Sequence, residues 1–247
     1  MRSAILRALL VLSTVGLILA AAKYLDRRPV REFGIRIDRR WMSDAIVGVI
    51  IGGAIPTGTV LMSYFGGWVT VSDTEFNITT NYLREIGLAI TITVSIAVVE
   101  ELVFRGYILT NAIEGFDIRW LSQPGIIAAA WGASAILFAM VHPAPSLLQG
   151  LHFLGAGLLL GFAYLLSGQI GLSIGIHTGF NFVSTYVFPT TLEPSVSVFT
   201  LVVGGPTWFI GQSGLLQTAL LIPAAFAVIG YVWWQSGSIK IRPEEFY

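Results

Sequence analysis

The chain has 247 residues, of which 55% are hydrophobic and only 11% are charged, and its net charge is zero. Ordinary soluble domains carry roughly 25% charged residues, so this composition excludes that class and predicts a polytopic membrane protein embedded in a lipid bilayer. The neutral net charge argues against a nucleic-acid partner, and the absence of cysteine excludes disulfides, a thiolate nucleophile and cysteine-ligated metals.

Apolar stretches long enough to cross a bilayer recur along the chain. We expect seven of them, at 4–22, 44–65, 85–111, 124–141, 147–166, 169–188 and 214–234. The stretch 196–210 is interrupted by Gly204, Gly205 and Pro206, and it forms either an eighth, short or re-entrant helix or none. Gly157 and Gly161 form a G-x-x-x-G pair that favours close helix packing. The predicted fold class is all-α, a polytopic transmembrane helical bundle of seven to eight spans that forms one integral-membrane domain over residues 1–247.

The distribution of positive charge predicts the orientation of these spans. Segment 23–40 holds half of the fourteen lysines and arginines, and such loops stay in the cytoplasm. The first span is therefore expected to be uncleaved, with its N-terminus outside, rather than a signal peptide. The next loop carries Asp73 and Glu75 and is expected outside, and seven spans then place Lys240 and Arg242 in the cytoplasm. We expect a multi-pass protein of the cell membrane.

Two adjacent carboxylates, Glu100 and Glu101, lie within the third apolar stretch. An ionisable side chain in hydrocarbon costs roughly 2.5–3.5 kcal/mol, so it indicates a functional site. Glu101 and Arg105 are four residues apart and share a helix face, which predicts an ion pair. Glu100 is rotated by about 100° from Glu101 and has no cation on its own helix, which suits a general base. The alternative is that both glutamates only pair with arginines to hold helices together.

Two histidines follow on later apolar stretches. His142 ends the fourth stretch, one turn after Phe138, and His177 precedes Asn181 by one turn. An imidazole and an amide on one helix face can donate hydrogen bonds to a developing oxyanion. The alternatives are an interfacial histidine at 142 and interhelical hydrogen bonds at 177 and 181. The remaining histidine, His152, is expected to be structural, facing a cavity or a neighbouring helix.

A metal ion is the competing explanation for these residues. One glutamate and two histidines are ligands that zinc accepts while it keeps a position for water. Either Glu100 and His142 activate water directly, or Glu100, His142 and His177 hold zinc, which lowers the pKa of the water. The cofactor is therefore none or one zinc ion. The ligands come from three helices, and neither histidine has an evident carboxylate partner of the kind that metal-bound imidazoles have, which favours direct activation.

The order of the three motifs, E-E-x-x-x-R, F-x-x-x-H and H-x-x-x-N, resembles the CPBP family. This family comprises the CAAX prenyl endopeptidases and the bacteriocin-processing or abortive-infection (Abi) proteins, and the resemblance covers a catalytic core at about 85–190. It implies that Glu100 and His142 activate water and that His177 and Asn181 form the oxyanion hole. It also implies structural support from a second group of residues: Glu101, Arg105 and Phe138. The family is often labelled metalloprotease, although a metal-free glutamate mechanism has also been proposed for it.

The expected function is an intramembrane endopeptidase that hydrolyses a peptide bond of a membrane-associated protein or peptide, prenylated or not. The alternative is a catalytically silent membrane scaffold or bacteriocin-immunity protein. A small-solute transporter is a third option, but such proteins often contain paired repeats, and none is evident. One geometric conflict remains. With straight alternating spans, His142 lies ~27 Å beyond Pro124, far from Glu100 and His177, unless the fourth helix starts deep, tilts or follows a re-entrant segment at 111–123.

Overall fold

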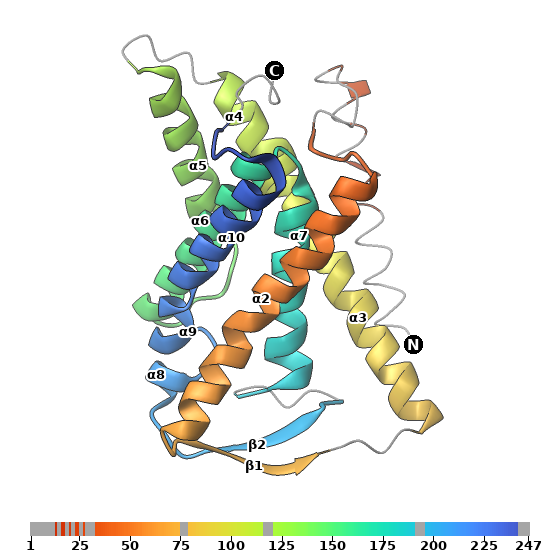
Figure 1. Ribbon diagram of the computed structural model, residues 1–247, viewed down its shortest axis with the longest axis vertical. Helices are drawn as coiled ribbons and strands as arrows, with labels where there is room; N and C mark the ends of the chain where they lie inside the picture. Colours follow the sequence, from red (N-terminus) through yellow and green to blue (C-terminus); the bar gives the residue numbers. More distant parts are fainter. Residues whose placement is uncertain are drawn as a thin grey trace.

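The computed structural model describes residues 33–74, 79–115, 121–190 and 196–241, together with isolated positions between 13 and 27. The predicted first span, 4–22, therefore lies almost wholly outside the described residues, as do Glu75 and Arg242. The described chain is a helical bundle with a small sheet across one end (Figure 1). Its elements are α2 (Arg39–Phe65), β1 (Val69–Thr74), α3 (Thr80–Glu101), the π-helix η2 (Leu102–Leu109), α4 (Thr110–Gly115), α5 (Gln123–Met140), α6 (Leu147–Ser167), α7 (Ile170–Phe182), the π-helix η3 (Val183–Val187), β2 (Phe199–Val203), α8 (Thr207–Ile210), α9 (Leu215–Ala219) and α10 (Leu221–Ser236).

The described residues contain four helices that are long and apolar enough to cross a membrane. They are α2, the continuous helix α3–η2–α4, α5 and α6. A fifth is added if the segment 207–236, which bends by 43° between α9 and α10, counts as one span. The predicted span 169–188 is divided between α7, with 13 residues, and η3, with 5. The polytopic helical fold is thus confirmed, whereas the described residues give four or five spans rather than seven to eight.

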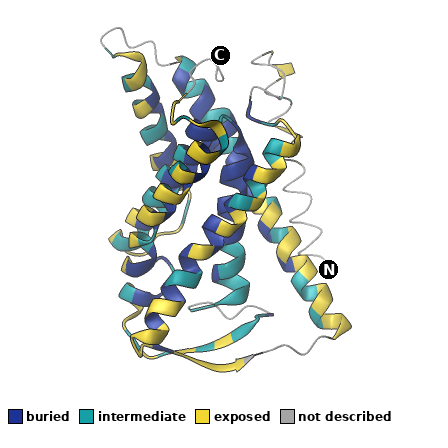
Figure 2. Ribbon diagram, in the orientation of Figure 1, coloured by how far each residue is buried: buried dark blue, intermediate teal, exposed yellow. Residues whose placement is uncertain are grey.

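The outer surface of the bundle is apolar, as lipid-facing helices require. Exposed positions cover the outer faces of α2, α3 and α10 (Figure 2). They include large apolar side chains such as Phe65, which is 82% exposed, and Phe226, which is 67% exposed. Patches of this kind are rare on soluble monomers, so the surface agrees with an integral membrane protein.

The interpretation of 196–210 as an eighth, short or re-entrant helix is wrong. Its centre forms β2, which pairs antiparallel with β1, with Val69 opposite Val203. Burial alternates along β2, which is the two-residue period of a strand. Only the four residues of α8 are helical. The partner strand lies more than 120 residues earlier in the chain, so an apolar run by itself could not reveal this pairing.

Helices α2 and α7 pack with their backbones in direct contact because glycines face each other. A Cβ atom at Gly48 or Gly52 would overlap the α7 backbone, and a Cβ atom at Gly175 or Gly179 would overlap the α2 backbone. Both pairs have the small-x-x-x-small spacing that allows close approach. The predicted pair at Gly157 and Gly161 also packs closely, against α5. The contact between α2 and α7 is the closer of the two. It fixes α7, which carries the third motif, against α2.

The conflict over the depth of His142 disappears because the helix α3–η2–α4 ends, and α5 begins, at the same end of the bundle (Figure 1). Both Glu100 and His142 can therefore be placed by their distance from that end. The helix α3–η2–α4 has 36 residues, and 14 of them, the 8 of η2 and the 6 of α4, follow Glu101. At about 1.5 Å per residue, Glu101 lies about 20 Å from Gly115, and α5, with its 18 residues, is about 27 Å long. Figure 1 shows the turn between α5 and α6 near mid-height of the bundle rather than at its far end. His142 therefore reaches a depth similar to that of Glu100, and residues 111–115 are helical rather than re-entrant.

Candidate active site

The first motif lies where α3 changes into the π-helix η2, directly after Glu101. π-Helical turns are rare in proteins, and those that do occur are frequently found at functional sites. Their wider winding leaves carbonyl groups that side chains can bind. Ser134 Oγ on α5 donates to the carbonyl oxygen of Phe104 at 2.8 Å, and Thr110 Oγ1 donates to that of Arg105 at 3.2 Å. The π-helix is thereby tied to α5, the helix that carries the second motif.

A fully buried ion pair lies behind the site. Arg105 Nη1 donates to Glu101 Oε1 at 2.9 Å, and both side chains are 0% exposed. This confirms the predicted pair. Arg105 Nη2 also donates to the carbonyl oxygen of Gly157 at 2.9 Å, and the guanidinium lies 4.5 Å from the centre of the Phe138 ring. The same Oε1 atom accepts from His177 Nδ1 at 2.9 Å, a contact that the sequence did not predict. Glu101 therefore holds Arg105 and His177 together.

His142 is oriented by its own helix end. Its Nδ1 atom lies 2.7 Å from the carbonyl oxygen of Phe138, and because a carbonyl only accepts, Nδ1 carries a hydrogen. Nε2 then points to Glu100, with 3.5 Å between Nε2 and Oε2. Burial disfavours the charged imidazole, but the contacts with Glu100 and the Phe138 carbonyl outweigh burial and raise the pKa of His142. Glu100 and His142 can therefore share a proton.

Glu100 Oε2 lies between two imidazoles. It is 3.5 Å from His142 Nε2 and 3.8 Å from His177 Nε2, longer than an ordinary hydrogen bond. This oxygen is buried and has no hydrogen-bond partner among the residues that the structure describes. Such an acceptor is available to a proton from a bound molecule, which is the requirement for a general base.

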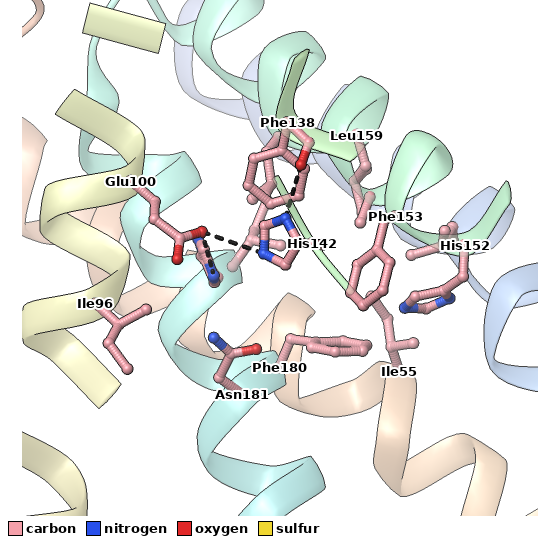
Figure 3. A pocket seen from close by; sticks show the side chains of 15 residues that line it. Ile55, Ile96, Glu100, Phe138, His142, His152, Phe153, Leu159, Phe180 and Asn181 are labelled. Carbon is pink, nitrogen blue, oxygen red and sulfur yellow. Dashed lines mark hydrogen bonds and ion pairs between the residues drawn. The ribbon is translucent and has the colours of Figure 1, made fainter. Parts of the chain in front are cut away.

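These groups face a cavity of about 220 Å³. Figure 3 shows Glu100, His142 and Asn181 at one end of it and His152 at the other. His177 and Phe138 line the same cavity. The walls between the ends are apolar and include Ile55, Phe153, Leu159, Leu160, Phe180 and Leu221. An apolar cavity with a few convergent polar groups is the usual form of a binding site for a small molecule or a peptide side chain.

The structure brings every predicted site residue together, although the catalytic roles of these residues stay predictions. Two neighbours were missed. Phe153 stacks on His142, with ring centres 4.7 Å apart, but nothing distinguishes it among the 15 phenylalanines of the chain. Ser134, which binds the π-helix, likewise carries no local signal. His152 was expected to face a cavity or a neighbouring helix, and it does both, since it bonds to Thr218 on α9.

The predicted metal ligands do not form a metal site as they lie. Within the described ranges, no three histidine, aspartate or glutamate side chains are arranged to hold a metal ion, so we derive no step through one. The prediction that neither histidine has a carboxylate partner is wrong for His177, which binds Glu101. His177 therefore has a carboxylate partner of the kind that metal-bound imidazoles have, so this criterion does not favour direct water activation over zinc.

Comparison with known proteins finds one family whose description fits part of the chain. Residues 82–183 match the family described as Rce1-like, type II CAAX prenyl endopeptidase Rce1-like. No curated protein and no solved structure matches the chain. The matched segment runs from α3 to the start of η3, so it contains all three motifs and the buried ion pair. The match confirms the resemblance inferred from the motifs: this segment, which is less than half of the chain, is similar to the CAAX prenyl endopeptidases, which are proteases of the hydrolase class.

Proposed function

We propose that the chain is an intramembrane endopeptidase of the cell membrane, which hydrolyses a peptide bond of a membrane-associated protein or peptide, prenylated or not. Water is activated by Glu100 and His142. The observation that carries this proposal is one carboxylate oxygen of Glu100, which has no hydrogen-bond partner among the described residues and lies between two imidazole nitrogens at one end of an apolar cavity. The cavity binds the substrate beside the scissile bond, and its polar end performs the chemistry.

The reaction follows from these positions. Glu100 accepts a proton from water while the water oxygen attacks the peptide carbonyl, and His142 keeps the carboxylate in place. The proton then passes to the leaving nitrogen as the carbon–nitrogen bond breaks. The amide of Asn181 donates to the oxyanion. His177 already carries a hydrogen on Nδ1 for Glu101, so it donates to the oxyanion through Nε2 only when both of its ring nitrogens carry a hydrogen.

We also propose seven spans. They are the five candidates described above, with the bent segment 207–236 counted as one span, together with the N-terminal stretch 4–22 and α7. The stretch 196–210 is not counted as a span of its own. Two observations support the predicted orientation. Arg40 and Lys240 line one small cavity, so the start of α2 and the segment after α10 share one end of the bundle. Asp73 lies on β1, in the sheet at the other end (Figure 1).

The test is proteolysis by the purified protein in liposomes, with a panel of membrane-anchored peptides that includes prenylated ones. Wild type should cleave at least one peptide, and Glu100→Gln should cleave none while its melting temperature stays within about 4 °C of the wild-type value. Glu85→Gln is the matched control, because Glu85 is on the same helix, where it pairs with exposed Arg84. Turnover by Glu100→Gln would refute the assignment of the base. Absence of cleavage by wild type across the panel would favour the silent scaffold.

A further inference from the structure

His152 lies at the end of the cavity opposite Glu100, and the proposed chemistry does not use it (Figure 3). The residue is 1% exposed, and its ring packs against those of Phe153 and Phe180, at 5.8 and 5.6 Å between ring centres. A polar ring in such surroundings is costly unless its nitrogen atoms are bound. The bonding of its two nitrogens therefore indicates what it is for.

The first nitrogen is occupied, and its hydrogen can be assigned. Thr218 Oγ1 donates its only hydrogen to the carbonyl oxygen of Gly214 at 2.8 Å. Because that hydrogen is already used, the 3.0 Å contact between Thr218 Oγ1 and His152 Nδ1 requires the hydrogen to be on Nδ1. In the neutral ring Nε2 then has none and is an acceptor. The structure gives this Nε2 no hydrogen-bond partner within its described ranges.

The distance between His152 and the end of the cavity that holds Glu100 limits which substrate side chains can contact His152. Phe153 stacks on His142 at 4.7 Å and contacts His152 at 5.8 Å, so a single phenyl ring separates the two imidazoles. A substrate side chain that begins beside the scissile bond reaches His152 only if it is long. It must also be apolar along the part that lies against Phe153 and Phe180. Serine and threonine are too short, and a lysine would bring a charge into an apolar cavity.

We infer that His152 determines specificity: its Nε2 accepts a hydrogen bond from the donor at the tip of an aromatic substrate side chain beside the scissile bond. Tyrosine is the side chain of this description, with its hydroxyl on Nε2 and its ring between Phe153 and Phe180. Thr218 is a positioning residue that keeps the hydrogen on Nδ1. This inference rests on the proposed function, since the cavity must hold a peptide.

The experiment measures binding, so that it does not depend on turnover. Acylated peptides in liposomes are scanned in pairs that carry either tyrosine or phenylalanine at one position after another. Dissociation constants are measured for Glu100→Gln protein, alone and with His152→Phe, Thr218→Val or Thr218→Ser added. With Glu100→Gln alone, the tyrosine peptide should bind at least about fivefold more tightly than the phenylalanine peptide at one position. The reason is that a peptide without the hydroxyl group leaves the buried acceptor Nε2 unpaired.

The ratio of the dissociation constants of the two peptides distinguishes a specific loss of tyrosine recognition from general damage to the protein. His152→Phe keeps an aromatic ring but removes the acceptor, so the ratio should fall to about one, and Thr218→Val should lower it as well. Thr218→Ser keeps the hydroxyl and should preserve the ratio. A variant that is merely misfolded weakens both peptides equally and leaves the ratio unchanged. Equal binding of tyrosine and phenylalanine at every position, or a preference that survives in His152→Phe, would overturn the inference. Absence of proteolysis would instead count against the proposed function alone.

Discussion

Glu101→Gln should destabilise the protein, because it removes the only negative charge paired with a fully buried guanidinium in the described structure. The change keeps the size of the side chain. Arg105 would retain the carbonyl oxygen of Gly157 at 2.9 Å and the face of Phe138 at 4.5 Å, but no carboxylate hydrogen bond. Breaking a buried pair in this way costs roughly 3–5 kcal/mol. For a chain of 150–250 residues each kcal/mol lowers the melting temperature by about 2–4 °C, so we expect a fall of about 6–20 °C.

The assay is thermal unfolding in one detergent, with Glu100→Gln as the matched control. The side chain of Glu100 is 26% exposed and makes only the longer contacts with the histidines, so its loss should change the melting temperature by less than about 4 °C, or roughly 1 kcal/mol. A double variant, Glu101→Gln with Arg105→Met, removes both charges and should be more stable than Glu101→Gln alone. Equal melting temperatures for the two single variants, or no recovery in the double variant, would refute the reasoning.

Four further outcomes are expected. Asn181→Ala should lower kcat by roughly 10²–10³ with near-normal substrate binding, and an unchanged kcat in steady-state assays would remove it from the oxyanion hole. Gly52→Ala should reduce folded yield and melting temperature, because its Cβ meets the α7 backbone, whereas Gly87→Ala meets nothing within 4 Å and should be neutral or slightly stabilising; similar losses in both would contradict the packing argument. Cysteines at Ser72 and Ser238 should react with an impermeant reagent from opposite sides of the membrane, and labelling from one side would refute the proposed orientation. Chelation should leave activity intact if water is activated directly, whereas one zinc ion per chain by elemental analysis, lost together with activity, would establish the metal mechanism.

The local part of the site could be predicted because it depends on spacing within one helix. Glu101 and Arg105 are four residues apart, so any helical conformation places them on one face, and their pairing follows without knowledge of neighbours. The same argument places His177 and Asn181 together. The apolar composition likewise predicted helices in a membrane, since lipid leaves few other ways to satisfy the backbone. The order of the motifs then gave the resemblance to the CPBP family, which the match over residues 82–183 supports.

The contacts between elements could not be predicted in this way. The hydrogen bond from His177 to Glu101 joins residues 76 positions apart, and that between His152 and Thr218 joins residues 66 apart. The depth of His142 depends on the length of a different helix, α3–η2–α4. Spacing along the chain determines which side chains share one helix face. Which faces meet depends on the packing of all the helices at once, and here on glycines that let α2 and α7 touch; the cavity and both of its ends exist only as a result of that packing.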